Sequence, residues 1–214
     1  VLRTMAGVDV LCMSWLRTFP FVSCGSFSNV LLSQTVKTDL ANDLGNLVSR
    51  TTAMVGKSFG GTLPEGCGAT EEEKKLAAAC AGATGDSGAL SGEGAQFDGE
   101  LIGLAAGLRN RYQAAMDTFA PHKALDEVFK VIQRANKYID ENAPWALAKD
   151  MESNGARLAH VLYNLLETTR ICGILLSPVM PESCDKLFAQ IGADEAVRTW
   201  DAAAWGSLSE TAAV

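Results

Sequence analysis

Three polar side chains recur at every fourth residue along one segment of the sequence: Asn42, Asn46 and Arg50. In an α-helix each residue turns the chain by about 100°, so this spacing places all three on one stripe. Two amides and a guanidinium offer donors and acceptors suited to the edges of unstacked nucleic-acid bases. On spacing alone, a solvated row or asparagines that bridge to a neighbouring helix is the more frequent explanation.

A second candidate is Trp145, which follows Ala143 and Pro144 at the expected end of a helix. A tryptophan at a helix junction, fixed by a preceding proline, can present its ring as a platform on which a base stacks. Pro144 is therefore the supporting residue. The competing interpretation is a tryptophan of the hydrophobic core, which is the commoner role without further information.

The sequence contains no motif typical of catalysis. It has neither a Gly-x-Ser-x-Gly element nor a phosphate-binding Gly-x-x-x-x-Gly-Lys-Ser/Thr loop, and no Cys-x-x-Cys pair of a zinc site. We expect His160 to be a partly buried structural imidazole. We expect the run Glu71-Glu72-Glu73, followed by two lysines, to be a solvated helix face. No catalytic residue, metal or bound cofactor is therefore predicted for this chain.

The composition is that of a folded domain with an acidic surface. Of 214 residues 48% are hydrophobic, and 18 basic against 25 acidic residues give a net charge of −7. This balance argues against a generic polyanion binder, because non-specific phosphate binding depends on clustered Lys and Arg. No apolar run approaches the length of a membrane span. Scattered cysteines and the absence of a leader-like start favour the reducing cytoplasm. A start at Val1 suggests a piece of a longer protein.

Helical periodicity predicts an all-α, up-and-down helix bundle. Ser28 is the expected N-cap of a long helix that ends near Phe59, where two glycines follow. Further amphipathic stretches are expected at 101–119, 125–139 and 158–172, with a short helix at 181–190. A glycine-rich insertion, residues 66–96, lies between the long helix and the stretch at 101–119. It is expected to contain a short helix at 71–79 and an exposed, flexible stretch from Gly82 to Gly94.

Together these segments resemble the anticodon-binding domain of bacterial methionyl-tRNA synthetase, a class I methionine–tRNA ligase. The resemblance runs from about Gly7 to Trp205. Its most specific parts are the strings at 39–50, at 135–140 with Pro144-Trp145, and at 178–181, which match in order and spacing. The sequence departs from the family at Cys12-Met13, where Arg-Tyr is expected.

The resemblance implies a role for each candidate. Trp145 would stack on an anticodon base, while Asn42, Asn46 and Arg50 would hydrogen-bond base edges of the methionine anticodon. Residues 1–27 would connect to a catalytic domain absent from this chain, residues 28–205 would form the anticodon-binding domain, and residues 206–214 would be a C-terminal tail. The expected partners are the anticodon stem-loop of the tRNA for methionine and that N-terminal catalytic domain, but neither DNA nor a membrane.

In the family, ATP with magnesium serves the catalytic domain, whose motifs this chain lacks. The chain alone is therefore expected to be inactive as a ligase. Two alternatives remain open at this stage. One is a free-standing helical module for protein interaction, suggested by the acidic charge. The other is the equivalent domain of another class I synthetase, which shares the helical bundle.

Overall fold

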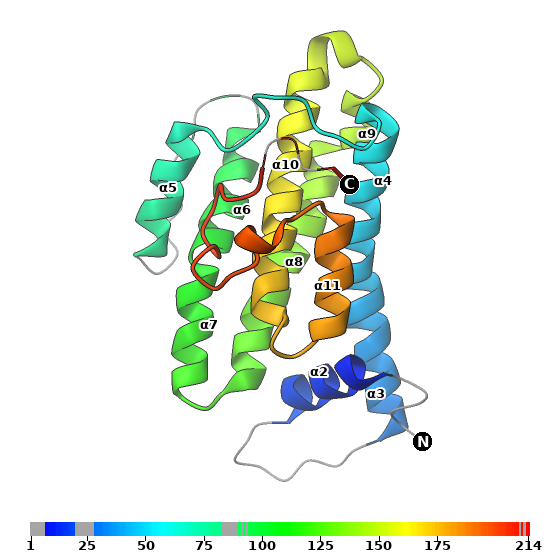
Figure 1. Cartoon of the computed structure of the whole chain (residues 1–214), viewed down its shortest axis with the longest axis vertical. Coiled ribbons are helices and arrows are strands. Elements are labelled where there is room, and N and C mark those ends of the chain that lie inside the picture. Colours follow the sequence, from blue (N-terminus) through cyan, green and yellow to red (C-terminus); the bar gives the residue numbers. More distant parts are fainter. Residues whose placement is uncertain are drawn as a thin grey trace.

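The computed structural model describes residues 7–19, 28–82, 90, 92, 94–209, 211 and 213–214. Within these ranges the chain is a bundle of helices, and the one pairing of strand type is a single bridge between Thr62 and Ala213 (Figure 1). The predicted all-α, up-and-down bundle is thus confirmed. Most of the stretch expected to be exposed, Gly82 to Gly94, lies outside the described residues, as does much of the connector at 1–27.

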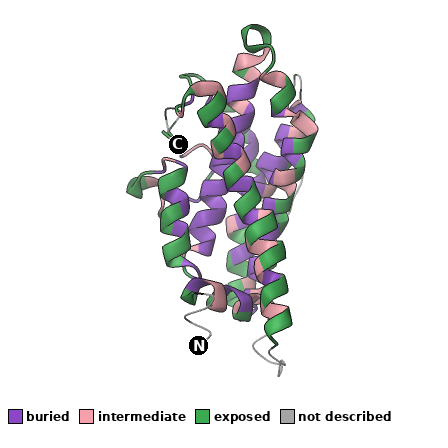
Figure 2. Ribbon diagram, turned by 90° about the vertical axis from the view of Figure 1, so that its right-hand side faces the viewer, coloured by how far each residue is buried: buried purple, intermediate pink, exposed green. Residues whose placement is uncertain are grey.

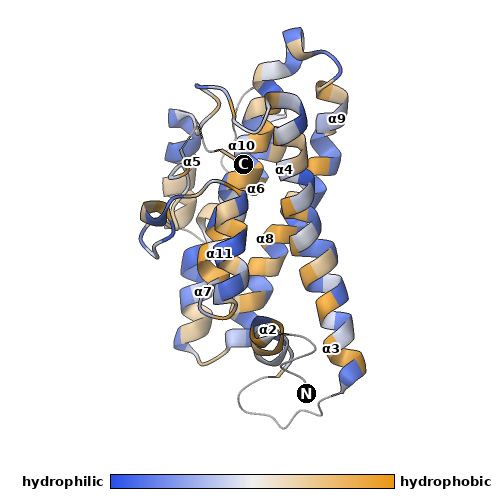
Figure 3. Ribbon diagram, turned by 45° about the vertical axis from the view of Figure 1, so that its right-hand side comes forward, coloured by the Kyte–Doolittle hydropathy of each residue, from blue (hydrophilic) through white to orange (hydrophobic). Residues whose placement is uncertain are grey.

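The long helix predicted from Ser28 to Phe59 has the predicted ends. Ser28 caps helix α3 (Asn29–Thr35), since its Oγ accepts a hydrogen bond of 3.1 Å from the backbone N–H of Leu31. Helix α4 (Asn46–Phe59) ends at Gly60, whose φ of 66° is the left-handed conformation that favours glycine. Hydrophobic and hydrophilic residues alternate along α4, as expected for a helix with one buried face (Figure 3).

The middle of this long helix differs from the prediction. Residues Val36–Gly45 form a π-helix, η1, so that the backbone N–H of Asn46 reaches the carbonyl of Ala41, five residues earlier. A π-helix has more residues per turn than an α-helix. The assumed rotation of 100° per residue is therefore wrong over these ten residues. It applies from Asn46 onward.

Two antiparallel helices form the centre of the bundle, α8 (Pro121–Asn142) and α10 (Met151–Leu176) (Figure 1). From Leu158 to Leu176 every residue of α10 except His160 is buried, and Figure 2 shows this helix largely in purple. A helix that is buried on all sides belongs to a core rather than to a surface. The other helices therefore pack around α10.

The surrounding helices follow the predicted pattern with one break. The insertion contains α5 (Glu71–Ala81), and the predicted stretch at 101–119 is divided at Gly107 into α6 (Ala95–Ala106) and α7 (Leu108–Asp117). Helix α11 (Pro181–Gln190) has the predicted bounds, and α9 (Pro144–Leu147) and η2 (Glu195–Val197) are single turns.

The described part of the predicted connector packs on the bundle. Helix α2 (Val8–Thr18) lies across one end of it (Figure 1). Buried Asp9 accepts a hydrogen bond of 2.7 Å from the backbone N–H of Ser183 in the first turn of α11. Arg17 pairs with Asp39 at 2.5 Å and with Asp126 at 2.7 Å. These contacts join α2 to η1, α8 and α11.

The described part of the predicted tail, 206–214, also packs on the bundle. The Glu167 carboxylate accepts backbone N–H bonds from Gly206 (2.7 Å), Ser207 (2.9 Å) and Leu208 (3.2 Å). Its partner is Arg170 at 2.7 Å, and both side chains are completely buried. Arg170 donates in addition to three carbonyls of the preceding segment, those of Val197, Ala202 and Ala204. This pair attaches the C-terminal segment to α10.

None of the helices in the described ranges is long and apolar enough to cross a membrane.

The buried pair predicts a large effect of one neutralising substitution. Glu167→Gln leaves the Arg170 charge buried without a counter-charge, so the free energy of unfolding should fall by about 3–5 kcal/mol. Urea denaturation followed by circular dichroism measures this. The matched control is Glu71→Gln, which removes an exposed pair with Lys74 at the same spacing and should cost below about 0.5 kcal/mol. Equal effects of the two substitutions would contradict the role assigned to the buried pair.

Candidate nucleic-acid interface

The structure brings together Arg50 of α4 and Trp145 of α9. The Arg50 guanidinium carbon lies 5.8 Å from the centroid of the Trp145 ring, within the range of a cation–π contact. Trp145 is 48% exposed and thus is not a core tryptophan. The two features that the sequence suggested separately therefore share one surface of the bundle.

A carboxylate on α8 holds the guanidinium of Arg50. Arg50 Nη2 donates to Asp140 Oδ1 at 2.7 Å, and the pair is exposed to solvent. Exposed ion pairs contribute little to stability. The pair therefore matters chiefly for the orientation of the guanidinium, whose remaining N–H groups are available at the surface.

The turn between α8 and α9 explains the exposure of the indole. Ala143 adopts a left-handed conformation with φ of 43°, which is uncommon for a residue with a side chain. Pro144 is buried and occupies the first position of α9, where a proline lacks no needed N–H. The chain thus reverses abruptly after Asn142, and Trp145 is presented at the outer side of this corner.

Asn42 and Asn46 are both exposed, on η1 and at the start of α4. Between them Asp43 faces α8, where its side chain accepts from Gln133 Nε2 at 2.9 Å and its carbonyl from Asn136 Nδ2 at 3.0 Å. These contacts fix the rotation of the helix and leave the asparagines facing solvent. Asn46 lies one helical turn, about 6 Å, before Arg50.

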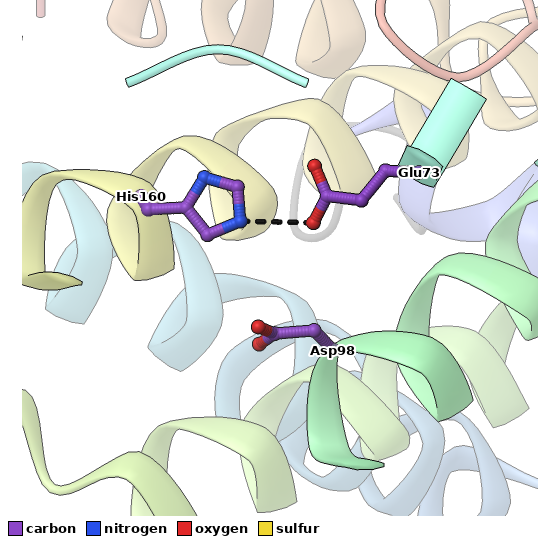
Figure 4. A group of neighbouring side chains, drawn as sticks. All are labelled: Glu73, Asp98 and His160. Carbon is purple, nitrogen blue, oxygen red and sulfur yellow. Dashed lines mark hydrogen bonds and ion pairs between the residues drawn. The ribbon is translucent and has the colours of Figure 1, made fainter. Parts of the chain in front are cut away.

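A second group of polar side chains, which the sequence did not single out as a group, lies inside the bundle. Glu73 of α5, Asp98 of α6 and His160 of α10 place their ligand-type atoms within 4.8 Å of one another (Figure 4). Glu73 is only 3% exposed, so the expectation of a solvated face is wrong for this residue. The reason is the N-terminal turn of α5, where Glu73 completes a capping box with Thr70 and then reaches His160.

The carboxylates of this group have positively charged or hydrogen-bonding partners close by. Arg157 donates to both oxygens of Asp98, at 2.5 and 2.9 Å, and the hydroxyl of Tyr138 donates to the same carboxylate. His160 has acceptors at both ring nitrogens: the carbonyl of Cys67 at 3.1 Å and the Glu73 carboxylate at 2.8 Å. Two acceptors favour the doubly protonated imidazolium. When His160 is protonated, two cations face two carboxylates in this cluster.

The pKa shifts follow from these contacts. Burial by itself would lower the pKa of His160, but the hydrogen bond and the charge of Glu73 outweigh burial and raise the pKa above its ordinary value. Burial would raise the pKa of Glu73, but the bond to His160 and its charge lower that pKa below its ordinary value. His160 is thus a structural imidazole, as the sequence predicted, and it ties α5 and the preceding loop to α10.

Known proteins resemble this chain over nearly its whole length. A sequence profile described as the anticodon binding domain of methionyl tRNA ligase matches residues 91–213, more than half of the chain. The chain is 42% identical over 204 residues, 95% of its length, to methionine–tRNA ligase of Caldanaerobacter subterraneus subsp. tengcongensis, and covers 28% of that protein. It is 36% identical to the Bacillus subtilis methionine–tRNA ligase, with 96% of this chain and 27% of that protein covered.

Solved structures similar to this chain are also methionyl-tRNA synthetases. Mycobacterium tuberculosis methionyl-tRNA synthetase in complex with methionyl-adenylate has a TM-score of 0.78 and 31% identity, covering 97% of this chain and 37% of that chain. Its free-state structure has a TM-score of 0.77. The chain spans just over a quarter of the length of the sequence relatives described above.

The Glu73–His160 pair predicts a pH dependence of stability. His160 has a raised pKa, so its contribution is fully present below its ordinary value of 6.5 and is lost as the pH rises through the folded pKa. Glu73 has a lowered pKa, so its contribution is present above its ordinary value of 4.5 and is lost as the pH falls through the folded pKa.

Denaturant unfolding between about pH 5 and pH 9 should therefore show a loss of stability on the alkaline side. His160→Gln should flatten this limb, while His122→Gln, at the chain's other histidine, should leave it in place. Persistence of the limb in His160→Gln would assign it to another group.

Proposed function

Since this chain belongs to the family of anticodon-binding domains of methionyl-tRNA ligases, we propose that it recognises the anticodon stem-loop of the tRNA for methionine. The observation that carries this proposal is the exposed contact between Arg50 and Trp145, together with the exposed amides of Asn46, one turn before Arg50 on α4, and of Asn42, on η1. An open aromatic face stacks on a base, and the amides and guanidinium bond to base edges.

The proposed contacts need little net charge. A net charge of −7 opposes non-specific attraction to RNA. Stacking and neutral amide bonds do not depend on a basic surface, and Arg50 supplies one local cation. We therefore expect selective but weak binding by the isolated chain, because contacts to the remainder of the tRNA would belong to other parts of a longer protein.

The activity of the whole relatives is part of the proposal. In a full-length protein this domain would position the tRNA for ATP-dependent attachment of methionine by a catalytic domain that uses magnesium, in the cytoplasm. The chain itself would bind neither ATP nor metal and would be inactive as a ligase. Family membership favours this function over a free-standing interaction module and over the domain of another class I synthetase.

Trp145→Ala is predicted to weaken binding of the methionine anticodon stem-loop. Loss of one stacked base costs about 1–3 kcal/mol, or about 5- to 150-fold in Kd. Fluorescence anisotropy of a labelled stem-loop measures this, and Trp145→Phe should retain most of the affinity. The matched control is Trp200→Ala. Trp200 is also exposed, and its ring centroid lies 5.1 Å from the guanidinium carbon of Arg109. An equal loss in both variants would mean that the effect is not local to the proposed site.

The amide row is predicted to affect discrimination more than affinity. One base-edge hydrogen bond is worth about 0.5–1.5 kcal/mol, so Asn46→Ala should narrow the preference for the methionine anticodon by about 2- to 13-fold. The comparison is a stem-loop with the same stem and an exchanged anticodon. If the unmodified chain binds both stem-loops equally, the proposed function is wrong.

A further inference from the structure

The corner that presents Trp145 is tied to the interior by an arginine of α10. Arg157 Nη2 donates to Asn142 Oδ1 at 2.6 Å, and Asn142 is the last residue of α8, three positions before Trp145. The amide of Asn142 also donates to the carbonyl of Tyr138 at 3.0 Å. Asn142 therefore links the end of α8 to α10 directly before the chain reverses.

This corner needs such support because its backbone is strained. Ala143 holds a left-handed conformation, with φ of 43°, and α9 is a single turn of four residues. A residue with a side chain is strained in this conformation and holds it only where the surroundings impose it. The contact from Arg157 to the preceding residue is one such constraint.

Arg157 is itself rigidly held. Its guanidinium forms a two-point pair with Asp98, whose side chain is only 6% exposed and also accepts from the Tyr138 hydroxyl at 2.5 Å. The guanidinium lies against Gly94, which has a φ of 73°, and a Cβ at that position would collide with it. Because the guanidinium is planar and is bonded to Asp98 along one edge, the directions of its remaining N–H groups are fixed.

We propose that Arg157 is a positioning residue for Trp145: through Asn142 it sets the corner that orients the indole for stacking on an anticodon base. Arg157 does not touch the RNA in this proposal. It acts through two partners: Asp98, whose two hydrogen bonds fix the guanidinium, and Asn142, whose one hydrogen bond fixes the end of α8. The consequence for RNA binding rests on the proposed function, whereas the orientation of the indole does not.

The roles of charge and geometry can be separated. Arg157→Lys keeps the positive charge beside Asp98, but one ammonium cannot bond both carboxylate oxygens and Asn142 in the geometry of the fork. Asn142→Ala removes the acceptor and leaves the pair with Asp98 intact. Arg111→Lys is the matched control. Arg111, on α7, also pairs with a carboxylate, that of Glu127, and donates to a backbone carbonyl, that of Leu104.

The test is ¹⁹F NMR of the chain labelled with 5-fluorotryptophan, without RNA. Trp145→Phe assigns the resonance of Trp145 among the four tryptophans. Arg157→Lys and Asn142→Ala should shift or broaden that resonance and leave the resonance of buried Trp205 in place. Arg111→Lys should leave the Trp145 resonance unchanged. A Trp145 resonance unmoved in both Arg157→Lys and Asn142→Ala, with native circular dichroism, overturns the proposal.

The second readout is binding of the methionine anticodon stem-loop. Arg157→Lys and Asn142→Ala should each raise Kd by about tenfold, within the cost of losing one stacked base. If the unmodified chain binds no stem-loop, the proposed function fails while the NMR result still decides the positioning. A shifted Trp145 resonance with unchanged Kd would overturn the link between orientation and binding.

Discussion

The bundle depends on an ion pair that is completely buried. Glu167 and Arg170 lie on α10 among core residues, and they bond the backbone of the C-terminal segment from Val197 to Leu208. Charges of this kind are tolerated in a core only when each hydrogen-bonding position has a partner. Six backbone groups of that segment are thereby bonded to two side chains of α10. The most buried helix is therefore also the helix that organises the polar contacts.

The same helix connects the interior to the proposed RNA surface. Toward its N-terminal end, Arg157 and His160 bind carboxylates from α6 and α5, and Arg157 continues to the end of α8. The corner that carries Trp145 thus rests on buried charge pairs rather than on loop residues alone. An acidic chain can in this way present one well-placed cation, Arg50, and one indole without a basic surface.

Much of the fold follows from local chemistry. Ser28 and Gly60 mark the ends of the long helix because a cap and a left-handed glycine act within one turn. The π-helical turns of η1 escaped prediction, because the spacing of apolar residues along the chain does not distinguish a π-helix from an α-helix. The burial of Glu73 was not predicted either, because its hydrogen-bond partner, His160, lies 87 residues away in the sequence.

The amino-acid sequence by itself determined the helical class and the choice of Asn42, Asn46, Arg50 and Trp145 as candidates, because periodicity and spacing are properties of neighbours along the chain. Tertiary structure decided that Arg50 and Trp145 meet, 95 positions apart in sequence and 5.8 Å in space. It also decided which charges are buried and paired. Such pairings depend on how helices pack, and no local pattern encodes which distant side chain completes a hydrogen bond.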